Sequence, residues 1–219
     1  MDDTLDISGV SEEGEEQITS EQVFQQLEEI WVNERLSPNL MLCRTDITEC
    51  ILEQMQEMEE NIARAKKTDL KVSLHQLELD RIRYVLSSYL RCRLEKIEKH
   101  AAYLIKKESS DGPSVSRLSP EEFMFAKELT SGVTSHLTAS ALKHMPKNLQ
   151  TLNLEDSGKV PNLDHYVFLR VNKAEEGIIV DCETDVQNED KIDLEVDAQH
   201  IMRYKLIENL VENQTVSLI

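Results

Sequence analysis

Residues 69–107 form a run of 39 residues without glycine or proline, and this run constrains the fold more than any other feature. Leucine and isoleucine recur in it at spacings of three and four, which is the period of an α-helix. Two apolar stripes, shifted around the helix axis, are Leu79, Ile82, Leu86, Leu90, Leu94, Ile97 and Ala101, and Leu70, Leu74 and Leu77. The pattern predicts one helix roughly 55–60 Å long, because each helical residue adds about 1.5 Å.

This predicted helix is longer than a small domain is wide. Apolar residues on more than one side of a helix indicate burial on more than one side. We therefore expect another protein chain to cover part of it. The residues expected to anchor that contact are Leu86, Leu90, Leu94 and Ile97.

Three further helices are expected before residue 150. The first begins near Thr19, which forms a capping box with Gln22, and ends at Ser37-Pro38. The second covers 46–66, and its methionines at helical spacing are interpreted as core. The last is expected to begin at the N-terminal capping sequence Ser119-Pro120-Glu121-Glu122 and to end at Pro146. Gly132 in its middle is interpreted as a weak point or a place of close packing.

The pattern changes to β-structure after about residue 154. Strands are expected at 166–171, 178–180, 192–196, 201–204 and 215–218, with a short helix at 206–211. Residues 172–177 are interpreted as a hairpin connection between the first two strands. The fold class is thus α+β: an all-α domain of four to five helices, one very long, then a small β-rich domain. The expected boundaries are a tail at 1–18, a helical domain at 19–150, a linker at 151–163 and a β-rich domain at 164–219.

The C-terminal segment is apolar to its last residue, so we expect it to be docked rather than frayed. A β-rich unit of about 60 residues is near the lower size limit for independent folding. We therefore expect it to lock onto a partner through apolar strands. The residues expected in that contact are Val216, Leu218 and Ile219.

Charge is distributed unevenly along the chain. The net charge is −18, yet residues 61–107 hold 12 basic and 5 acidic side chains. A generally acidic chain is a poor DNA binder, because phosphate binding needs clustered Lys and Arg. The basic positions are interpreted as a solvated face that pairs in part with the acids of 46–66, and direct DNA contact is kept as an alternative. They are Arg81, Arg83, Arg91, Arg93, Lys96 and Lys99.

No catalytic, cofactor or metal motif rises above chance. The sequence lacks a phosphate-binding glycine loop, and its histidines and its cysteines Cys43, Cys50, Cys92 and Cys182 show no metal-ligand spacing. Asp181, Glu183 and Asp185 alternate as in a calcium loop, but Val186 replaces the required glycine. We expect no enzyme, cofactor or metal. With neither a membrane-spanning run nor a signal peptide, a soluble intracellular protein is expected.

The acidic segment 1–18 sets Leu5 and Ile7 among acids. One interpretation is a solvated terminus. The alternative is a short peptide motif that docks these two aliphatic side chains into the groove of a partner.

Four segments resemble one known family. They are 69–99, 142–150, 164–171 and 31–38, and the order and spacing of these runs is similar to that of the Sld-five family of the eukaryotic GINS complex. The resemblance covers 19–219, and the acidic tail lies outside it.

The resemblance implies a non-catalytic structural subunit of a heterotetramer, with a helical domain followed by a small β-rich domain. It implies nuclear residence and three sister GINS subunits as partners. It also implies a place in the replicative helicase beside the minichromosome-maintenance hexamer and its accessory protein. Contacts with the leading-strand polymerase and a fork hub protein would be indirect, and DNA contact minor or absent. The alternative is a helical adaptor of another nuclear complex with a weak basic face for nucleic acid.

Overall fold

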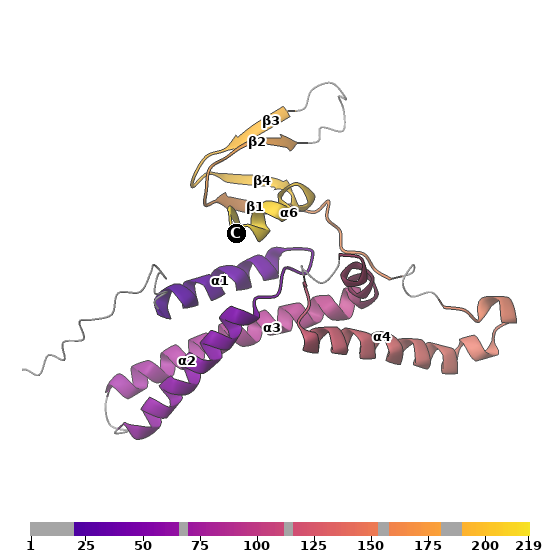
Figure 1. Ribbon diagram of the computed structural model, residues 1–219, viewed down its shortest axis with the longest axis horizontal. Coiled ribbons are helices and arrows are strands. Elements are labelled where there is room, and N and C mark those ends of the chain that lie inside the picture. Colours follow the sequence, from indigo (N-terminus) through magenta and orange to yellow (C-terminus); the bar gives the residue numbers. More distant parts are fainter. Residues whose placement is uncertain (1–19, 66–69, 112–115, 153–157, 181–189) are drawn as a thin grey trace, which may run out of the picture.

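A computed structural model describes residues 20–65, 70–111, 116–152, 158–180 and 190–219 of the chain. Helices fill the first part and small antiparallel sheets the second, which confirms the predicted α+β fold class (Figure 1). The helical elements are α1 (Ser20–Leu36), α2 (Thr45–Arg64), α3 (Leu70–Asp111), α4 (Pro120–Ser140), η1 (Leu142–His144) and η2 (Lys147–Leu149). The later elements are β1 (Tyr166–Val171), β2 (Glu175–Val180), β3 (Asp190–Leu194), β4 (Gln199–Arg203), α6 (Tyr204–Glu212) and β5 (Val216–Leu218). The domain boundaries given above stay a prediction.

Helix α3 forms the spine of the helical part. Its first half packs against α1 and α2 over an aliphatic core of Val23, Leu27, Ile51, Met55, Leu79, Val85 and Leu86. Its second half packs against α4 over Leu40, Ile97, Ala101, Leu104, Leu118 and Ala126. The burial of Met55 confirms that this methionine fills the core.

The long helix is present as predicted but is not uniform. His100 has φ −127° and ψ 20°, which are not helical values and mark a kink. Its Nδ1 lies 2.8 Å from the carbonyl oxygen of Lys159, so the kink lies where the chain passes from the helices to the sheets. Periodicity gave no sign of the kink, because the apolar stripe continues from Ile97 to Ala101.

Helix α4 begins at the predicted capping box. The Oγ of Ser119 accepts a hydrogen bond from the backbone N–H of Glu122, and the Glu122 carboxylate accepts one from the N–H of Ser119. The second half of the helix extends away from the rest of the molecule (Figure 1), and every residue of 131–140 except Thr134 is exposed. The helix ends at Ser140, ahead of the predicted stop at Pro146, and two short 3₁₀ turns follow.

The C-terminal part holds two small sheets. The first has the strand order β4-β1-β5, and the second pairs β2 with β3. The predicted hairpin between 166–171 and 178–180 is therefore wrong, because β1 pairs with β4 and β5 and not with β2. The hairpin was predicted because the two segments are close in sequence. In the structure, the buried side chains of β1 pack instead against α6 and the strands β4 and β5. This core consists of Val167, Leu169, Val171, Leu194, Met202, Tyr204, Ile207, Val211, Val216 and Leu218.

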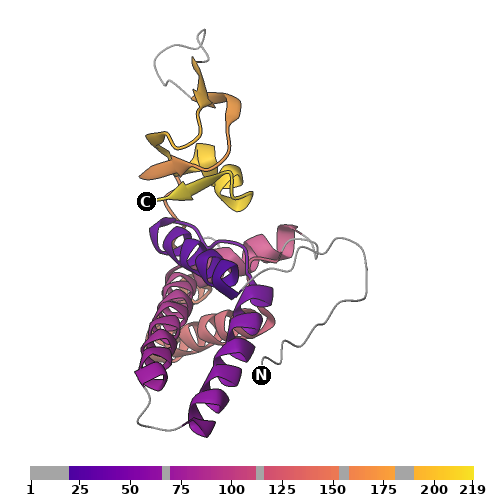
Figure 2. The same cartoon turned by 90° about the vertical axis from the view of Figure 1, so that its left-hand side faces the viewer.

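The β-rich part lies over α1, as Figures 1 and 2 both show. Polar side chains join the two parts. The amide of Asn39 donates to Glu208 on α6 at 2.8 Å. Arg117, just before α4, forms ion pairs of 2.7 Å with Glu212 and 3.4 Å with Glu208. These contacts hold α6 against the α1–α2 connection and the end of the α3–α4 connection.

Candidate partner-binding surfaces

The first candidate surface consists of aliphatic and aromatic side chains along α3 that nothing in the described part of the chain covers. Leu70, Leu74, Leu77 and Tyr84 recur at helical spacing on one face, and each is more than half exposed. Leu90 and Leu94 lie on another face and are 44% and 41% exposed. Two faces of one helix thus present apolar area to solvent.

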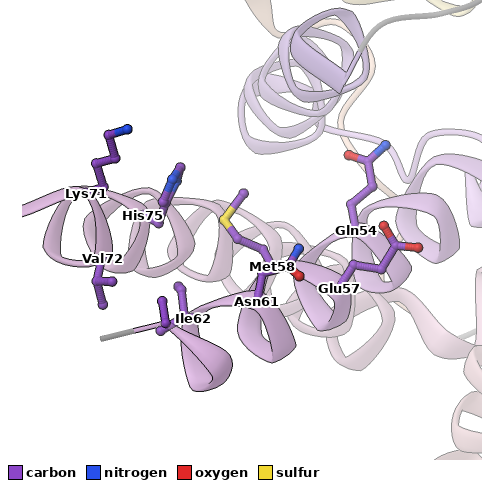
Figure 3. Close-up of a pocket in the computed structure, with 9 residues that line it drawn as sticks. Gln54, Glu57, Met58, Asn61, Ile62, Lys71, Val72 and His75 are labelled. Atoms are coloured by element: carbon purple, nitrogen blue, oxygen red, sulfur yellow. The ribbon is translucent and has the colours of Figure 1, made fainter. Parts of the chain in front are cut away.

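A groove lies between the C-terminal end of α2 and the N-terminal end of α3 (Figure 3). It has a volume of about 460 Å³ and includes Met58, Ile62 and Val72, with Glu57 and His75 at its polar edges. A second hollow on the same helices shares Ile62 and Val72 and reaches Leu77. An amphipathic segment of a partner would fit such an apolar groove with polar edges.

The predicted interface residues of α3 divide into two pairs. Leu90 and Leu94 lie on the surface, whereas Leu86 is 5% and Ile97 0% exposed inside this chain's own core. The expectation that Leu86 and Ile97 anchor a partner is corrected by this burial. The apolar stripe of α3 winds around the helix axis along its length. Helices α1, α2 and α4 therefore cover some of its residues and leave others exposed.

The predicted C-terminal interface divides in the same way. Val216 and Leu218 are 0% and 3% exposed in the core of the β4-β1-β5 sheet, so they do not face a partner. Ile219 is 53% exposed. Its backbone N–H donates to the carbonyl of Phe168 at 3.1 Å, which continues the sheet by one residue.

Sequence reasoning missed the outer face of this sheet. Phe168 on β1 pairs with Ile201 on β4, and both are about 60% exposed (62% and 58%). Tyr166 lies two residues before Phe168, on the same face, and is 57% exposed. The signal was available, because two of the three even positions in 166–171, Tyr166 and Phe168, hold large aromatic side chains although the odd positions already supply the buried face.

The predicted basic face of α3 is largely neutralised. Arg93 is 1% exposed and forms a bidentate pair with Glu122 of α4, with both distances 2.8 Å, and a 3.3 Å pair with Glu34 of α1. Lys96 donates to the Glu34 carboxylate at 2.6 Å and also to its backbone carbonyl. Arg93 and Lys96 therefore belong to a buried network that joins three helices, which corrects their assignment to a solvent face.

Burial and charge act against each other in this network. For Arg93, burial alone would lower the pKa, but the hydrogen bonds that it donates to Glu122 and the nearby charges raise it above the usual arginine value. For Lys96, burial wins over the attraction of Glu34, and the pKa lies below the usual lysine value. Arg93 stays charged at every pH of interest, so its position depends on the two carboxylates.

The remaining basic positions are exposed. Arg81 pairs with Glu28 of α1 at 2.7 Å, and Arg83 pairs with Glu59 of α2 at 2.6 Å. The second pair agrees with the interpretation that some of these cations meet the acids of 46–66. Arg91 and Lys99 are left with open donors, apart from a 3.9 Å approach of Lys99 to Glu95.

No group of three or more His, Cys, Asp or Glu side chains within the described residues is arranged to hold a metal ion. Cys43, Cys50 and Cys92 are free thiols. The acidic run at 181–185, with Cys182, and the motif residues Leu5 and Ile7 lie outside the described residues. None of the described helices is both long and apolar enough to cross a lipid bilayer.

Comparison with known proteins gives matches to both parts of the chain. A family model described as GINS complex protein helical bundle domain matches residues 46–141. A second, described as DNA replication complex GINS protein SLD5 C-terminus, matches residues 161–219. The SLD5 protein of Mus musculus is 49% identical over 224 residues, which cover all of both chains. The chain belongs to the SLD5 family of GINS complex proteins.

Other SLD5 proteins show how far the similarity extends. The Homo sapiens protein is 47% identical over 224 residues and covers all of both chains. The Arabidopsis thaliana protein is 28% identical over 209 residues, which are 88% of this chain and 89% of the plant protein. The chain is thus a GINS subunit of the SLD5 type in DNA replication, and neither matching family model describes an enzyme.

Proposed function

We propose that this SLD5-family chain is a non-catalytic structural subunit of a GINS heterotetramer. In this proposal the tetramer belongs to the replicative helicase, beside the minichromosome-maintenance hexamer and its accessory protein, and acts in the nucleus at initiation and elongation. It would help connect the helicase to the leading-strand polymerase. Family membership supports the proposal, since the SLD5 relatives are named as proteins of a DNA replication complex.

The observation that carries the proposal is the uncovered half of α4. A helical segment shorter than about 12–15 residues is only marginally stable in water without packing, because most helical stability comes from packing of an apolar face. Residues 131–140 pack very little against the described part of the chain, yet Val133 and Leu137 lie one helical turn apart on that segment and are 42% and 36% exposed. A partner helix laid along α4 would bury them.

The apolar faces of α3 support the same assignment. Leu90 and Leu94 have the i, i+4 spacing of residues that contact a neighbouring helix. The α2–α3 groove adds a third apolar surface to the same helical part (Figure 3). Exposed apolar patches with polar edges are typical of protein–protein interaction sites.

A direct role in DNA binding is the alternative class. Two observations weaken this alternative. Arg93 and Lys96 lie in the buried network, and Arg81 and Arg83 are paired with acids of α1 and α2. Binding of the assembled complex to single-stranded DNA with a steep salt dependence would favour it.

The first test is expression of the chain alone and together with the three other GINS subunits, with the molar mass of the soluble product measured by light scattering. We expect a poorly soluble or self-associating chain alone and a 1:1:1:1 particle on co-expression. A well-behaved monomer that ignores the other three subunits would contradict the proposal.

A matched pair of variants tests the surface on α3. Leu90→Asp should abolish recovery of the tetramer, because a carboxylate replaces an aliphatic anchor in the contact, where truncation of a central residue typically costs about 2 kcal/mol or more. Leu52→Asp is the control, since Leu52 on α2 is also about half exposed (52%) but lies on a different helix. Equal recovery of both variants would contradict the assignment of Leu90.

Leu5 and Ile7 lie outside the described residues, and their role in recruiting a fork hub protein is also a proposal. A titration of a peptide of residues 1–12 against that partner tests it. We expect binding that is lost when both aliphatic residues are replaced by Ser.

A further inference from the structure

A groove with a volume of about 590 Å³ lies between the C-terminal end of α1 and the middle of α3. The cations Arg35, Arg91, Lys96 and Lys99 line it against the single acid Glu95. This local excess of positive charge stands out on a chain whose net charge is −18. A charge excess inside a hollow attracts anions more strongly than the same charges on a flat surface.

Three of these cations keep donors available for a ligand. Arg91 is exposed and makes no hydrogen bond or ion pair with any described residue. Arg35 is exposed, and its guanidinium lies 5.9 Å from the centre of the Trp31 ring. Lys99 approaches only Glu95, at 3.9 Å with both side chains exposed, and such pairs contribute little. Lys96 differs, because its ammonium is directed inward to Glu34.

The groove also has an aromatic edge. Tyr84 lines it and is 65% exposed. Its ring meets that of Trp31 edge to face at a centroid distance of 6.3 Å, and the Trp31 Nε1–H donates to Ser88, so the edge is held in place. A ligand that combines carboxylates with an aliphatic side chain would therefore match both the cations and the exposed ring.

We propose that this groove binds the acidic N-terminal segment of the same chain, residues 1–18. The segment holds seven acidic and no basic side chains, and Leu5 and Ile7 lie among the acids. Charge complementarity and the aliphatic content both match the groove. The inference goes beyond the proposed function, because it assigns an intramolecular ligand to this groove.

The length of the segment permits this contact. Helix α1 begins at Ser20, and its 17 residues span roughly 25 Å, so the groove lies at the far end of α1 from the segment. Eighteen extended residues can reach roughly 60 Å, which is enough to run back along α1. A tethered ligand has an effective concentration on the order of millimolar, so weak ion pairs suffice. A partner that captures Leu5 and Ile7 would release the groove, which links the two binding events.

Photo-crosslinking in the full chain, assembled with its partner subunits, tests the proposal. A photoreactive phenylalanine derivative replaces Ile7, and mass spectrometry locates the cross-links. We expect them on the α1 end and the α3 segment that carry Arg35 and Arg91. The double variant Arg35→Glu, Arg91→Glu should lower the cross-link yield about tenfold, and raising the salt should lower it similarly, because exposed charges are screened.

The matched control is Arg64→Glu, since Arg64 is an exposed arginine on α2 that forms an ion pair with Glu60 and does not line the groove. It should leave the yield unchanged. Cross-links to a sister subunit or to another surface of this chain would overturn the proposal, as would a yield that the double variant does not change. Assembly is scored separately by light scattering, so a failure of the proposed function is distinguishable from a failure of this contact.

A second measurement does not depend on the photoreactive residue. A labelled peptide of residues 1–18 is titrated into the complex that contains the chain without these residues. Binding that the double variant weakens about tenfold, equivalent to about 1.4 kcal/mol, supports the groove. Absence of binding up to millimolar peptide overturns it.

Discussion

The side-chain oxygen of Asn33 on α1 accepts a hydrogen bond of 2.8 Å from the backbone N–H of Leu218 on β5, 185 positions away in the sequence. Strand β5 lies at an edge of its sheet, so this N–H has no strand to pair with. Asn33 supplies the missing acceptor in a buried place, where an unpaired N–H is costly. One amide thus ties the β-rich part to the helices.

Asn33→Ala should loosen this connection. Loss of the acceptor leaves a buried N–H unsatisfied, which costs about 1–3 kcal/mol. We expect faster hydrogen exchange at the amide of Leu218, measured by mass spectrometry or NMR, with little change in α2. Asn61→Ala, at an exposed position on α2, serves as the control. An exchange rate that is the same in both variants would refute the role of Asn33.

Glu34→Ala should be strongly destabilising. Glu34 is 0% exposed and provides the carboxylate for both Arg93 and Lys96. Removing one partner of a buried charge pair costs about 3–5 kcal/mol, because the remaining charge stays buried. Urea unfolding measures the loss. Glu28→Ala breaks only the exposed pair with Arg81 and should cost less than about 1 kcal/mol. Similar losses would show that the network contributes no more than a surface pair.

Tyr89→Phe should stabilise the chain. The Tyr89 hydroxyl is buried without a hydrogen-bond partner in the described part of the chain, and an unsatisfied hydroxyl costs about 1 kcal/mol or more. Burial also raises the pKa of Tyr89 to about 12, against the lowering effect of Arg93. The exposed Tyr84 offers the matched variant Tyr84→Phe, which we expect to be neutral.

The alkaline limb of the stability curve checks the same residue. In the unfolded chain tyrosine has a pKa of about 10, so between pH 10 and about 12 the folded state binds more protons than the unfolded state. The free energy of unfolding should therefore fall with rising pH in this window. Tyr89→Phe should reduce that fall, and an unchanged slope would contradict the buried phenol.

Gly132→Ala should separate stability from assembly. A Cβ at this position meets no atom within 4 Å, and the replacement gains about 0.5–1 kcal/mol of helix propensity. We expect higher helicity of the isolated chain by circular dichroism and a lower yield of the tetramer, because a glycine on an uncovered helix permits close approach of a partner. Ser131→Ala controls for helix propensity alone. An unchanged tetramer yield would make Gly132 only a local weak point.

The helices were predictable because they depend on local patterns. The absence of Gly and Pro from 69–107 and the capping box at Ser119 each fix an element from residues close in sequence. The predicted cap at Thr19 lies outside the described residues. Trp31 is half-buried: it packs against the core between α1, α2 and α3, and its ring meets that of the exposed Tyr84 edge to face.

The strand pairing was not predictable in the same way. Residues 172–177 look like a turn, but β1 reaches its partners β4 and β5 only through contacts more than 25 residues apart in the sequence. The burial of Arg93 could not be predicted from the sequence for a related reason. Its position on α3 resembles that of Arg91, and only the tertiary placement of Glu34 and Glu122 distinguishes the two.

The buried network of Glu34, Arg93 and Glu122 also restricts how this protein can evolve. A substitution that reverses or removes the charge of any one of these three side chains leaves a like-charge contact or an unpaired buried charge. The helices that carry them cannot move apart to relieve it without exposing the hydrophobic core. Drift at these positions must then proceed by paired or triple replacement, or by exchange of the whole set for apolar residues of similar volume. An alignment of many family members should accordingly show the three columns changing together.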